Sequence, residues 1–120
     1  QRPSYDFENS DKIRLFYNHI QQNFANRITL DDVSRLLNMS KVSFNRFIKK
    51  TTNLTFIEYL NEVRIENASR LLVEQDFTIS EIAFSCGFNN MANFNRVFKK
   101  IKGLTPSKYR KEFAGITNVL

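Results

Sequence analysis

The chain has 120 residues, of which 42% are hydrophobic, and this is enough for the packed core of one domain or of two very small ones. The composition excludes a fibrous repeat, and no apolar run approaches the roughly 20 residues that a membrane-spanning helix needs. One cysteine, Cys86, and one histidine, His19, are too few for an internal disulfide framework or a His/Cys zinc site. We therefore expect no metal, no cofactor, no membrane partner and a cytoplasmic location.

The positive charge is concentrated in two short segments. The formal net charge is +6, from 18 basic and 12 acidic residues. Residues 40–50 and residues 90–102 each carry four basic residues and no acid, whereas the rest of the chain is slightly acidic. Two compact basic patches predict a polyanionic partner, and nucleic acid is the partner that this pattern favours.

Helix signals follow one another along the chain, and strand alternation is absent. Ser10 can cap a first helix, because the apolar residues from Ile13 to Phe24 keep the spacing of one helix face. Further helix starts are predicted at Thr29, Ser40, Thr55, Thr78, Asn90 and Thr105. Two of them, Thr55 and Thr78, have a glutamate three residues later, which is the spacing of a capping box. The pattern predicts an all-α fold of seven helices.

Helix ends are marked as well. The second to fifth predicted helices run to Leu37 and to about Thr51, Gln75 and Cys86. Gly87 follows in a tight turn, where we expect a positive φ. Asn53 and Gly103 stand at the same place after the two basic helices, and both residue types tolerate the left-handed conformation there.

The two basic segments are copies of each other. FNRFIKKTTNLTFIEY, residues 44–59, aligns with FNRVFKKIKGLTPSKY, residues 94–109, at an offset of 50. Upstream the offset becomes 49, and Thr29 then matches Thr78. Because the period is long and the copies are few, the duplication predicts two similar modules rather than a solenoid.

The basic helix of each copy has an apolar and a polar face at about 100° per residue. In the first copy the predicted core face holds Phe44, Phe47 and Ile48, and the opposite face holds Val42, Asn45, Arg46 and Lys49. In the second copy the predicted core face holds Phe94, Val97, Phe98 and Ile101, and the opposite face holds Ala92, Asn95, Arg96 and Lys99. The two outward faces therefore correspond position by position.

The outward residues have the chemistry of base recognition. Arginine can bond guanine bidentately, asparagine can bond adenine in the same way, and a small apolar group can contact the thymine methyl. We therefore predict base contacts from Val42, Asn45, Arg46, Lys49, Ala92, Asn95, Arg96 and Lys99. We predict phosphate contacts from residues beside this face or at helix starts, namely Lys41, Ser43, Lys50, Asn90, Lys100 and Lys102.

Other interpretations stay open at this point. A basic helix face can be ordinary solvated surface, although its repetition in both copies favours a function. The pattern also fits a helical adaptor that docks an acidic protein partner, or an RNA-binding module. An enzyme is not predicted, because the chain offers no recognisable Ser/His/Asp or Cys/His set and no glycine-rich phosphate loop.

The segment ISEIAFSCGFNNMANFNRVFKKIKGLTPSKYR, residues 79–110, resembles the signature region of the AraC family of bacterial transcription regulators. The resemblance covers roughly residues 11–113 and includes the landmarks Gly87-Phe88 and Thr105-Pro106. It implies a homeodomain-like architecture of two helix-turn-helix subdomains joined by a long linking helix. The expected boundaries are a linker at 1–9, subdomains at 10–54 and 76–114, the linking helix at 55–75 and a tail at 115–120.

The resemblance also implies how the chain acts. Family members place two recognition helices in successive major grooves, and these helices correspond to residues 41–50 and 90–100. The correspondence adds Asn93 to the base-contact positions. The sequence departs from the family pattern at Asn53, where glycine is frequent, and at residues 91–93.

We therefore expect a sequence-specific, double-stranded DNA-binding domain of a bacterial transcription regulator. The resemblance implies an activator that contacts RNA polymerase, located in the cytoplasm at the nucleoid. The chain opens at Gln1 without a methionine, which indicates a fragment or a processed product. Because many family members carry an effector-binding or dimerisation domain before this unit, such a domain is expected upstream of Gln1.

Overall fold

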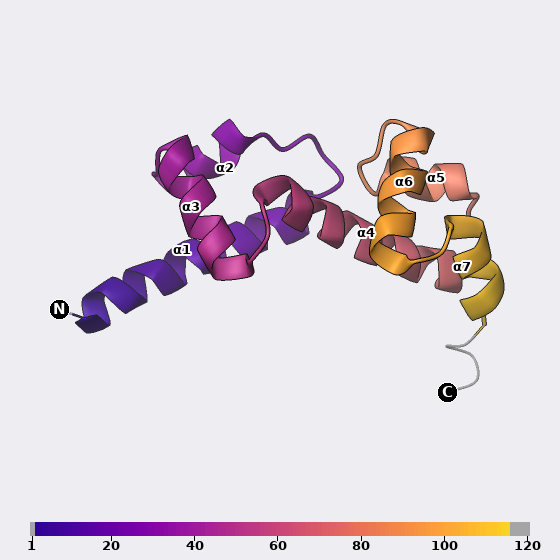
Figure 1. Ribbon diagram of the computed structural model, residues 1–120, viewed down its shortest axis with the longest axis horizontal. Coiled ribbons are helices and arrows are strands. Elements are labelled where there is room, and N and C mark those ends of the chain that lie inside the picture. The colour runs from indigo at the N-terminus through magenta and orange to yellow at the C-terminus, as the bar shows by residue number, and fades with distance from the viewer. Residues whose placement is uncertain (1, 116–120) are drawn as a thin grey trace. The chain divides into compact units, whose positions relative to one another are not determined.

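The computed structural model describes residues 2–115, with side chains from residue 9 onward. Within this range the chain forms seven helices and no strand, as Figure 1 shows. They are α1 (Arg2–Asn23), α2 (Leu30–Leu36), α3 (Lys41–Thr52), α4 (Phe56–Glu74), α5 (Ile79–Ser85), α6 (Met91–Lys102) and α7 (Pro106–Phe113). The predicted all-α class is confirmed. Over these residues no helix combines the length and apolar character that crossing a bilayer requires.

The two ends of the chain differ from the predicted boundaries in different ways. α1 begins at Arg2 and not after Ser10, so most of the expected linker at 1–9 is helical. Proline is tolerated in the first helical turn, so Pro3 does not prevent this extension. The apolar spacing that begins at Ile13 therefore did not mark the start of the helix. The predicted tail at 115–120 lies outside the described residues, apart from Gly115.

The other six predicted helix starts are confirmed by their capping geometry, whereas Ser10, the predicted cap of the first helix, lies inside α1. Thr29, Ser40, Thr78, Asn90 and Thr105 all have extended backbones, and each side chain accepts a hydrogen bond from the amide three residues later. At α4 the Thr55 amide donates to Glu58 Oε1 over 2.9 Å, and the Glu58 amide donates to Thr55 Oγ1 over 3.1 Å. These bonds satisfy amides that a helix start leaves without an internal partner.

The positive φ predicted at Asn53, Gly87 and Gly103 is confirmed, and a further one at Asn38 was not predicted. Asn53 has φ 65° and Gly103 has φ 82°, and each ends a basic helix. Gly87 has φ 101° in the turn after α5. Asn38, its counterpart at an offset of 49, has φ 57° in the turn after α2. Asparagine tolerates this region better than most residues with a Cβ, so the first module makes its turn without glycine.

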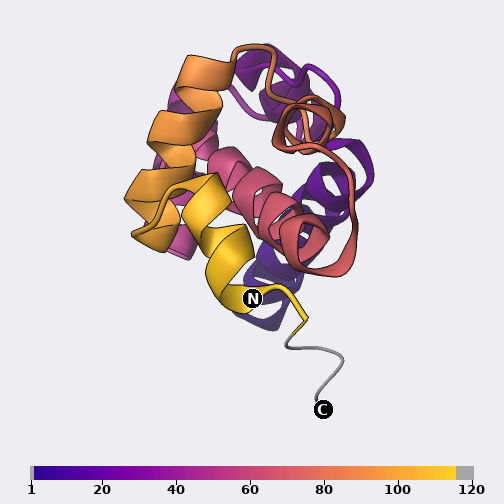
Figure 2. The same ribbon diagram turned by 90° about the vertical axis from the view of Figure 1, so that its right-hand side faces the viewer.

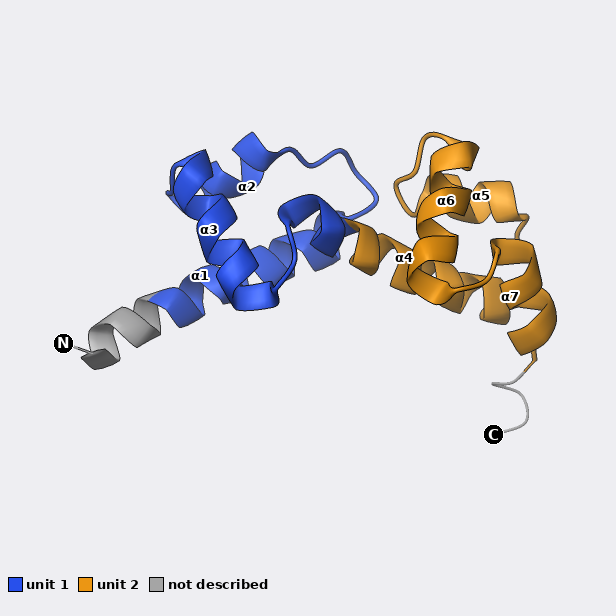
Figure 3. Cartoon of the chain, in the orientation of Figure 1, with its two compact units in different colours: residues 1–60 blue, residues 61–120 orange. Residues whose placement is uncertain are grey.

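The chain divides into two compact units, Gln1–Leu60 and Asn61–Leu120, coloured separately in Figure 3. The division falls inside α4. The first turn of this helix, Phe56–Leu60, belongs to the first unit, and the rest of the helix belongs to the second. The expected linking helix is therefore one continuous helix that contributes to the packing of both units.

The first unit is built around aromatic side chains. The Phe16 ring centroid lies 5.7 Å from that of Phe44, 6.3 Å from that of Phe56 and 5.2 Å from that of Tyr59. These contacts join α1, α3 and the first turn of α4. Lys12 Nζ also donates to the Leu37 carbonyl over 3.0 Å, which satisfies an acceptor at the end of α2.

The second unit repeats this arrangement with its own aromatic residues. The Phe94 ring lies 5.1 Å from Phe88 and 5.7 Å from Phe98, and Phe98 lies 5.4 Å from Tyr109. Arg110 Nε donates to the Leu72 carbonyl over 3.0 Å, which ties α7 to the end of α4. Figure 2 shows α5 of this unit nearly end-on, whereas α6 runs from top to bottom in the plane of the view. The two helices therefore point in clearly different directions.

Truncating Phe94 to alanine is expected to lower the free energy of unfolding by about 3–5 kcal/mol, because it removes a fully buried ring from the second core. Urea unfolding followed by circular dichroism measures the change. The matched control is Phe84→Ala on α5, whose side chain is 51% exposed and whose loss is expected to cost at most about 0.5 kcal/mol. Equal losses in both variants would contradict the described packing.

Candidate nucleic-acid interface

Each unit holds a short helix followed, after a tight turn, by a longer basic helix. The pair is α2 and α3 in the first unit, and α5 and α6 in the second. The turns pass through Asn38 and Gly87, both with positive φ, and each longer helix then begins at a side-chain cap. The duplication in the sequence therefore corresponds to two helix-turn-helix units.

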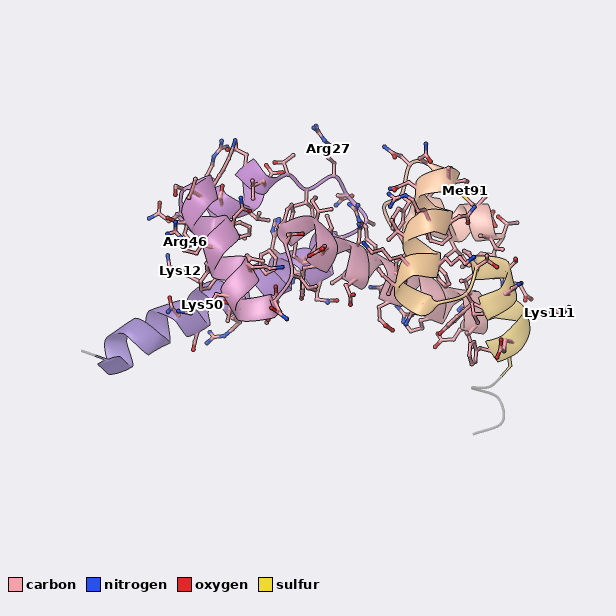
Figure 4. All side chains as sticks on the ribbon, in the orientation of Figure 1. Lys12, Arg27, Arg46, Lys50, Met91 and Lys111 are labelled. Atoms are coloured by element: carbon pink, nitrogen blue, oxygen red, sulfur yellow. The ribbon has the colours of Figure 1, made fainter. Side chains whose placement is uncertain are left out.

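α3 separates an apolar and a polar face, as predicted. Phe44 and Ile48 are completely buried, whereas Phe47 is only half-buried, because it lies at the edge of the core face. Val42 is 67% exposed, so its side chain is accessible on the polar face of the helix. The predicted base-reading residues Val42, Asn45, Arg46 and Lys49 are all exposed. Figure 4 shows Arg46 and Lys50 one turn apart along this helix.

α6 has the same organisation. Phe94, Val97 and Phe98 are buried, and Ile101, also predicted for the core, remains partly exposed near the end of the helix. Figure 4 marks Met91 at its first turn. The predicted base-reading residues Ala92, Asn93, Asn95, Arg96 and Lys99 are all exposed. The outward faces of α3 and α6 therefore share an asparagine, an arginine and a lysine at corresponding positions, Asn45/Asn95, Arg46/Arg96 and Lys49/Lys99.

The predicted phosphate-contacting residues fall into different environments. Lys50 and Lys100 are exposed and form no ion pair among the residues with described side chains. Lys41 is exposed, but its Nζ lies 3.7 Å from a carboxylate oxygen of Asp31. Ser43 is partly buried, and its amide donates to the cap Ser40 Oγ over 3.1 Å. Within the part of the chain whose side chains are described, Lys50 and Lys100 are thus the lysines of this set that have no carboxylate partner.

Lys102 is placed differently from its neighbours. Its Nζ lies 3.1 Å from both carboxylate oxygens of Glu66 and 6.0 Å from the Tyr109 ring centroid, and the side chain is only 21% exposed. The ion pair ties α6 to α4 inside the second unit. To reach a phosphate, Lys102 would have to leave Glu66, so its predicted role competes with a structural one.

Two asparagine side chains at the start of α6, the cap Asn90 and Asn93 in the first turn, also accept hydrogen bonds. Asn90 Oδ1 accepts from the Asn93 amide over 2.8 Å, so its oxygen serves the helix cap. Asn93 Oδ1 accepts a hydrogen bond from Arg96 Nη2. Sequence reasoning missed this pair, although a spacing of three residues on a helix was the signal for it.

The lone cysteine does not belong to this surface. Cys86 is buried, and burial raises the pKa of its thiol, which keeps the thiol protonated at neutral pH.

Comparison with known proteins decides the family. The profile of a helix-turn-helix domain family matches residues 33–112, which is well over half of the chain. The chain belongs to the AraC-type helix-turn-helix family. It is 29% identical over 109 residues to the Msm operon regulatory protein of Streptococcus mutans, covering 88% of this chain and 39% of that protein.

Two further similarities agree with this assignment. The chain is 30% identical over 102 residues to the bifunctional transcriptional activator/DNA repair enzyme AdaA of Bacillus subtilis, covering 85% of this chain and 48% of that protein. Among solved structures it is similar to the C-terminal domain of AraT, a response regulator from Geobacillus stearothermophilus, with 34% identity and a TM-score of 0.81. That match covers 86% of each chain.

Membership confirms the predicted fold, the predicted family and the DNA-binding function of a transcription regulator's domain. The chain spans less than half the length of each of these two curated relatives. The assignment of individual side chains to bases or phosphates stays a prediction.

Proposed function

We propose that the chain is the sequence-specific reader of double-stranded DNA in a transcription activator, with α3 and α6 entering successive major grooves. One observation carries the proposal. The outward faces of these two helices repeat the same Asn-Arg-x-x-Lys-Lys pattern, and every residue of the pattern is exposed while the residues between them pack on the core.

The chemistry of the repeated face suits base edges flanked by phosphates. Arg46 and Arg96 can each donate two hydrogen bonds to guanine O6 and N7, and Asn45 and Asn95 can pair with adenine. Val42 and Ala92 offer small apolar groups to a thymine methyl. Lysines next to this face can contact phosphates, which hold the helix in register but carry no sequence information themselves.

The activator role and the wider context belong to the same proposal. AdaA is named as a transcriptional activator, which supports activation by this chain's protein and therefore RNA polymerase as a further partner. The relatives are longer than this chain, which is consistent with an effector-binding or dimerisation domain outside it. The protein would act at the nucleoid in the cytoplasm, and no catalytic step is assigned to this chain.

A footprint on promoter DNA tests the proposal against the adaptor alternative. A DNA reader protects guanine N7 atoms in two neighbouring major-groove segments from methylation. An adaptor for an acidic protein would leave these guanine N7 atoms unprotected at any particular sequence. Absence of sequence-dependent protection would therefore overturn the proposal.

Replacing Arg46 or Arg96 with alanine is expected to cost about 1–3 kcal/mol of binding free energy on the preferred site. Each replacement should also relax the base preference in the part of the site that the arginine contacts. Selection of sites from randomised duplexes measures both effects. Lys50→Ala is the control, because loss of a phosphate contact weakens binding to all sequences alike. If Arg46→Ala weakened binding to random DNA as much as binding to the preferred site, Arg46 would not read bases.

A further inference from the structure

The guanidinium of Arg96 is held by a neighbouring side chain on the same helix. Arg96 Nη2 donates a hydrogen bond to Asn93 Oδ1. The backbone of Asn93 is itself restrained, since its amide donates to the cap residue Asn90 over 2.8 Å. The arginine is therefore attached to the capped first turn of α6.

The first unit carries the same arginine without this support. Ser43 occupies the position of Asn93, and its amide donates to the cap Ser40 over 3.1 Å, so the two helices start alike. Arg46 occupies the position of Arg96. Among the residues with described side chains, Arg46 makes no hydrogen bond or ion pair, and its side chain is exposed. The two units thus share the reading residue and the cap but differ in the residue between them.

We infer that Asn93 is a positioning residue that preorganises Arg96, so that α6 discriminates guanine more sharply than α3 does. This inference rests on the proposed function. The bond to Asn93 uses one Nη2 hydrogen, which leaves Nη1 and the second Nη2 hydrogen to face guanine O6 and N7. An arginine that is already ordered loses less conformational freedom when it binds.

The inference also changes the role expected of Asn93. Bidentate pairing with adenine needs both the oxygen and the nitrogen of the amide. Asn93 Oδ1 has two lone pairs, and one of them accepts from Arg96, so in this structure the orientation of the Asn93 amide is set by the arginine. Its contribution to specificity is therefore exerted through Arg96.

A reciprocal exchange of the two residues tests this inference. Asn93→Ser gives α6 the residue of α3, and Ser43→Asn does the reverse, while both caps are kept because they use only the backbone amides of these residues. Asn93→Ser is expected to lower the preference for guanine in the α6 block about twofold to tenfold, and Ser43→Asn to raise it in the α3 block. Site selection from randomised duplexes measures each preference.

A measurement on the free protein separates this inference from the proposed function. Nitrogen-15 relaxation of the arginine Nε–Hε groups reports side-chain order without any DNA. Arg96 is expected to be more ordered than Arg46, and Asn93→Ser to remove the difference. Equal disorder in the wild type would overturn the inference whatever the protein binds.

The remaining outcomes are also decisive. An ordered Arg96 in a protein that discriminates no DNA sequence would overturn the proposed function and the specificity role, while the positioning contact itself would stand. Loss of an adenine preference in Asn93→Ser, with the guanine preference intact, would show that Asn93 reads a base directly and would overturn the inference.

Discussion

Raising the salt concentration is expected to weaken DNA binding steeply, with log affinity falling against log salt at a slope of about −5 to −7. The physical reason is the release of counterions when six to eight phosphates are neutralised, at about 0.9 per contact. The exposed cations of the two recognition helices are numerous enough for this. They are Lys41, Arg46, Lys49, Lys50, Arg96, Lys99 and Lys100.

The expected effect is large and easily measured. Between 50 and 200 mM salt, such a slope corresponds to a loss of affinity of the order of 10³ or more. Fluorescence anisotropy with a labelled duplex follows it across the range. A slope shallower than about −2 would contradict binding through these two basic faces.

Two lysines close together on α6 provide a matched pair of variants for the same experiment. Lys100→Ala removes an exposed cation and is expected to make the slope less negative by about 1. Lys102→Ala is expected to leave the slope unchanged, because that ammonium is paired with Glu66. Equal changes in both variants would show that Lys102 leaves its carboxylate to contact DNA.

Inserting five base pairs between the two halves of the site is expected to abolish specific binding. One chain carries two recognition helices whose outward faces differ. Val42 in the first corresponds to Ala92 in the second, and Ser43 corresponds to Asn93. We therefore expect a monomer to recognise one asymmetric site, with two short blocks of specificity about 10 base pairs apart on one face of the DNA. Five base pairs turn one block to the opposite face, where the second helix of the same chain cannot reach it.

Mobility-shift titrations on the original and the lengthened duplex measure the effect. The control duplex carries the same five base pairs outside the two blocks and should bind as well as the original. Stoichiometry from analytical ultracentrifugation is expected to show one chain per site. A requirement for two chains on a palindrome, or full binding to the lengthened site, would refute this geometry.

The sequence by itself determined the features that depend on neighbours along the chain. Helix starts could be predicted because a Thr, Ser or Asn cap bonds an amide only three residues away, as at Ser40 and Asn90. The left-handed ends at Asn53 and Gly103 follow from which residues tolerate positive φ. The outward faces of α3 and α6 could be predicted because helical periodicity, read twice through the duplication, sorts buried from exposed positions.

Only the tertiary structure decided the features that depend on contacts between helices or on the rotamers of long side chains. The ammonium of Lys102 lies on Glu66, which is 36 residues away in the sequence. The boundary between the units falls inside α4, because its first turn packs on Phe16 and its later turns belong to the second core. Among the side chains that the structure describes, Arg96 has a hydrogen-bond acceptor in Asn93 and Arg46 has none, because Ser43, at the position of Asn93, is too short to meet the guanidinium. Periodicity gives the face of a helix on which a residue lies, whereas the partner that its polar atoms find depends on the packed arrangement around it.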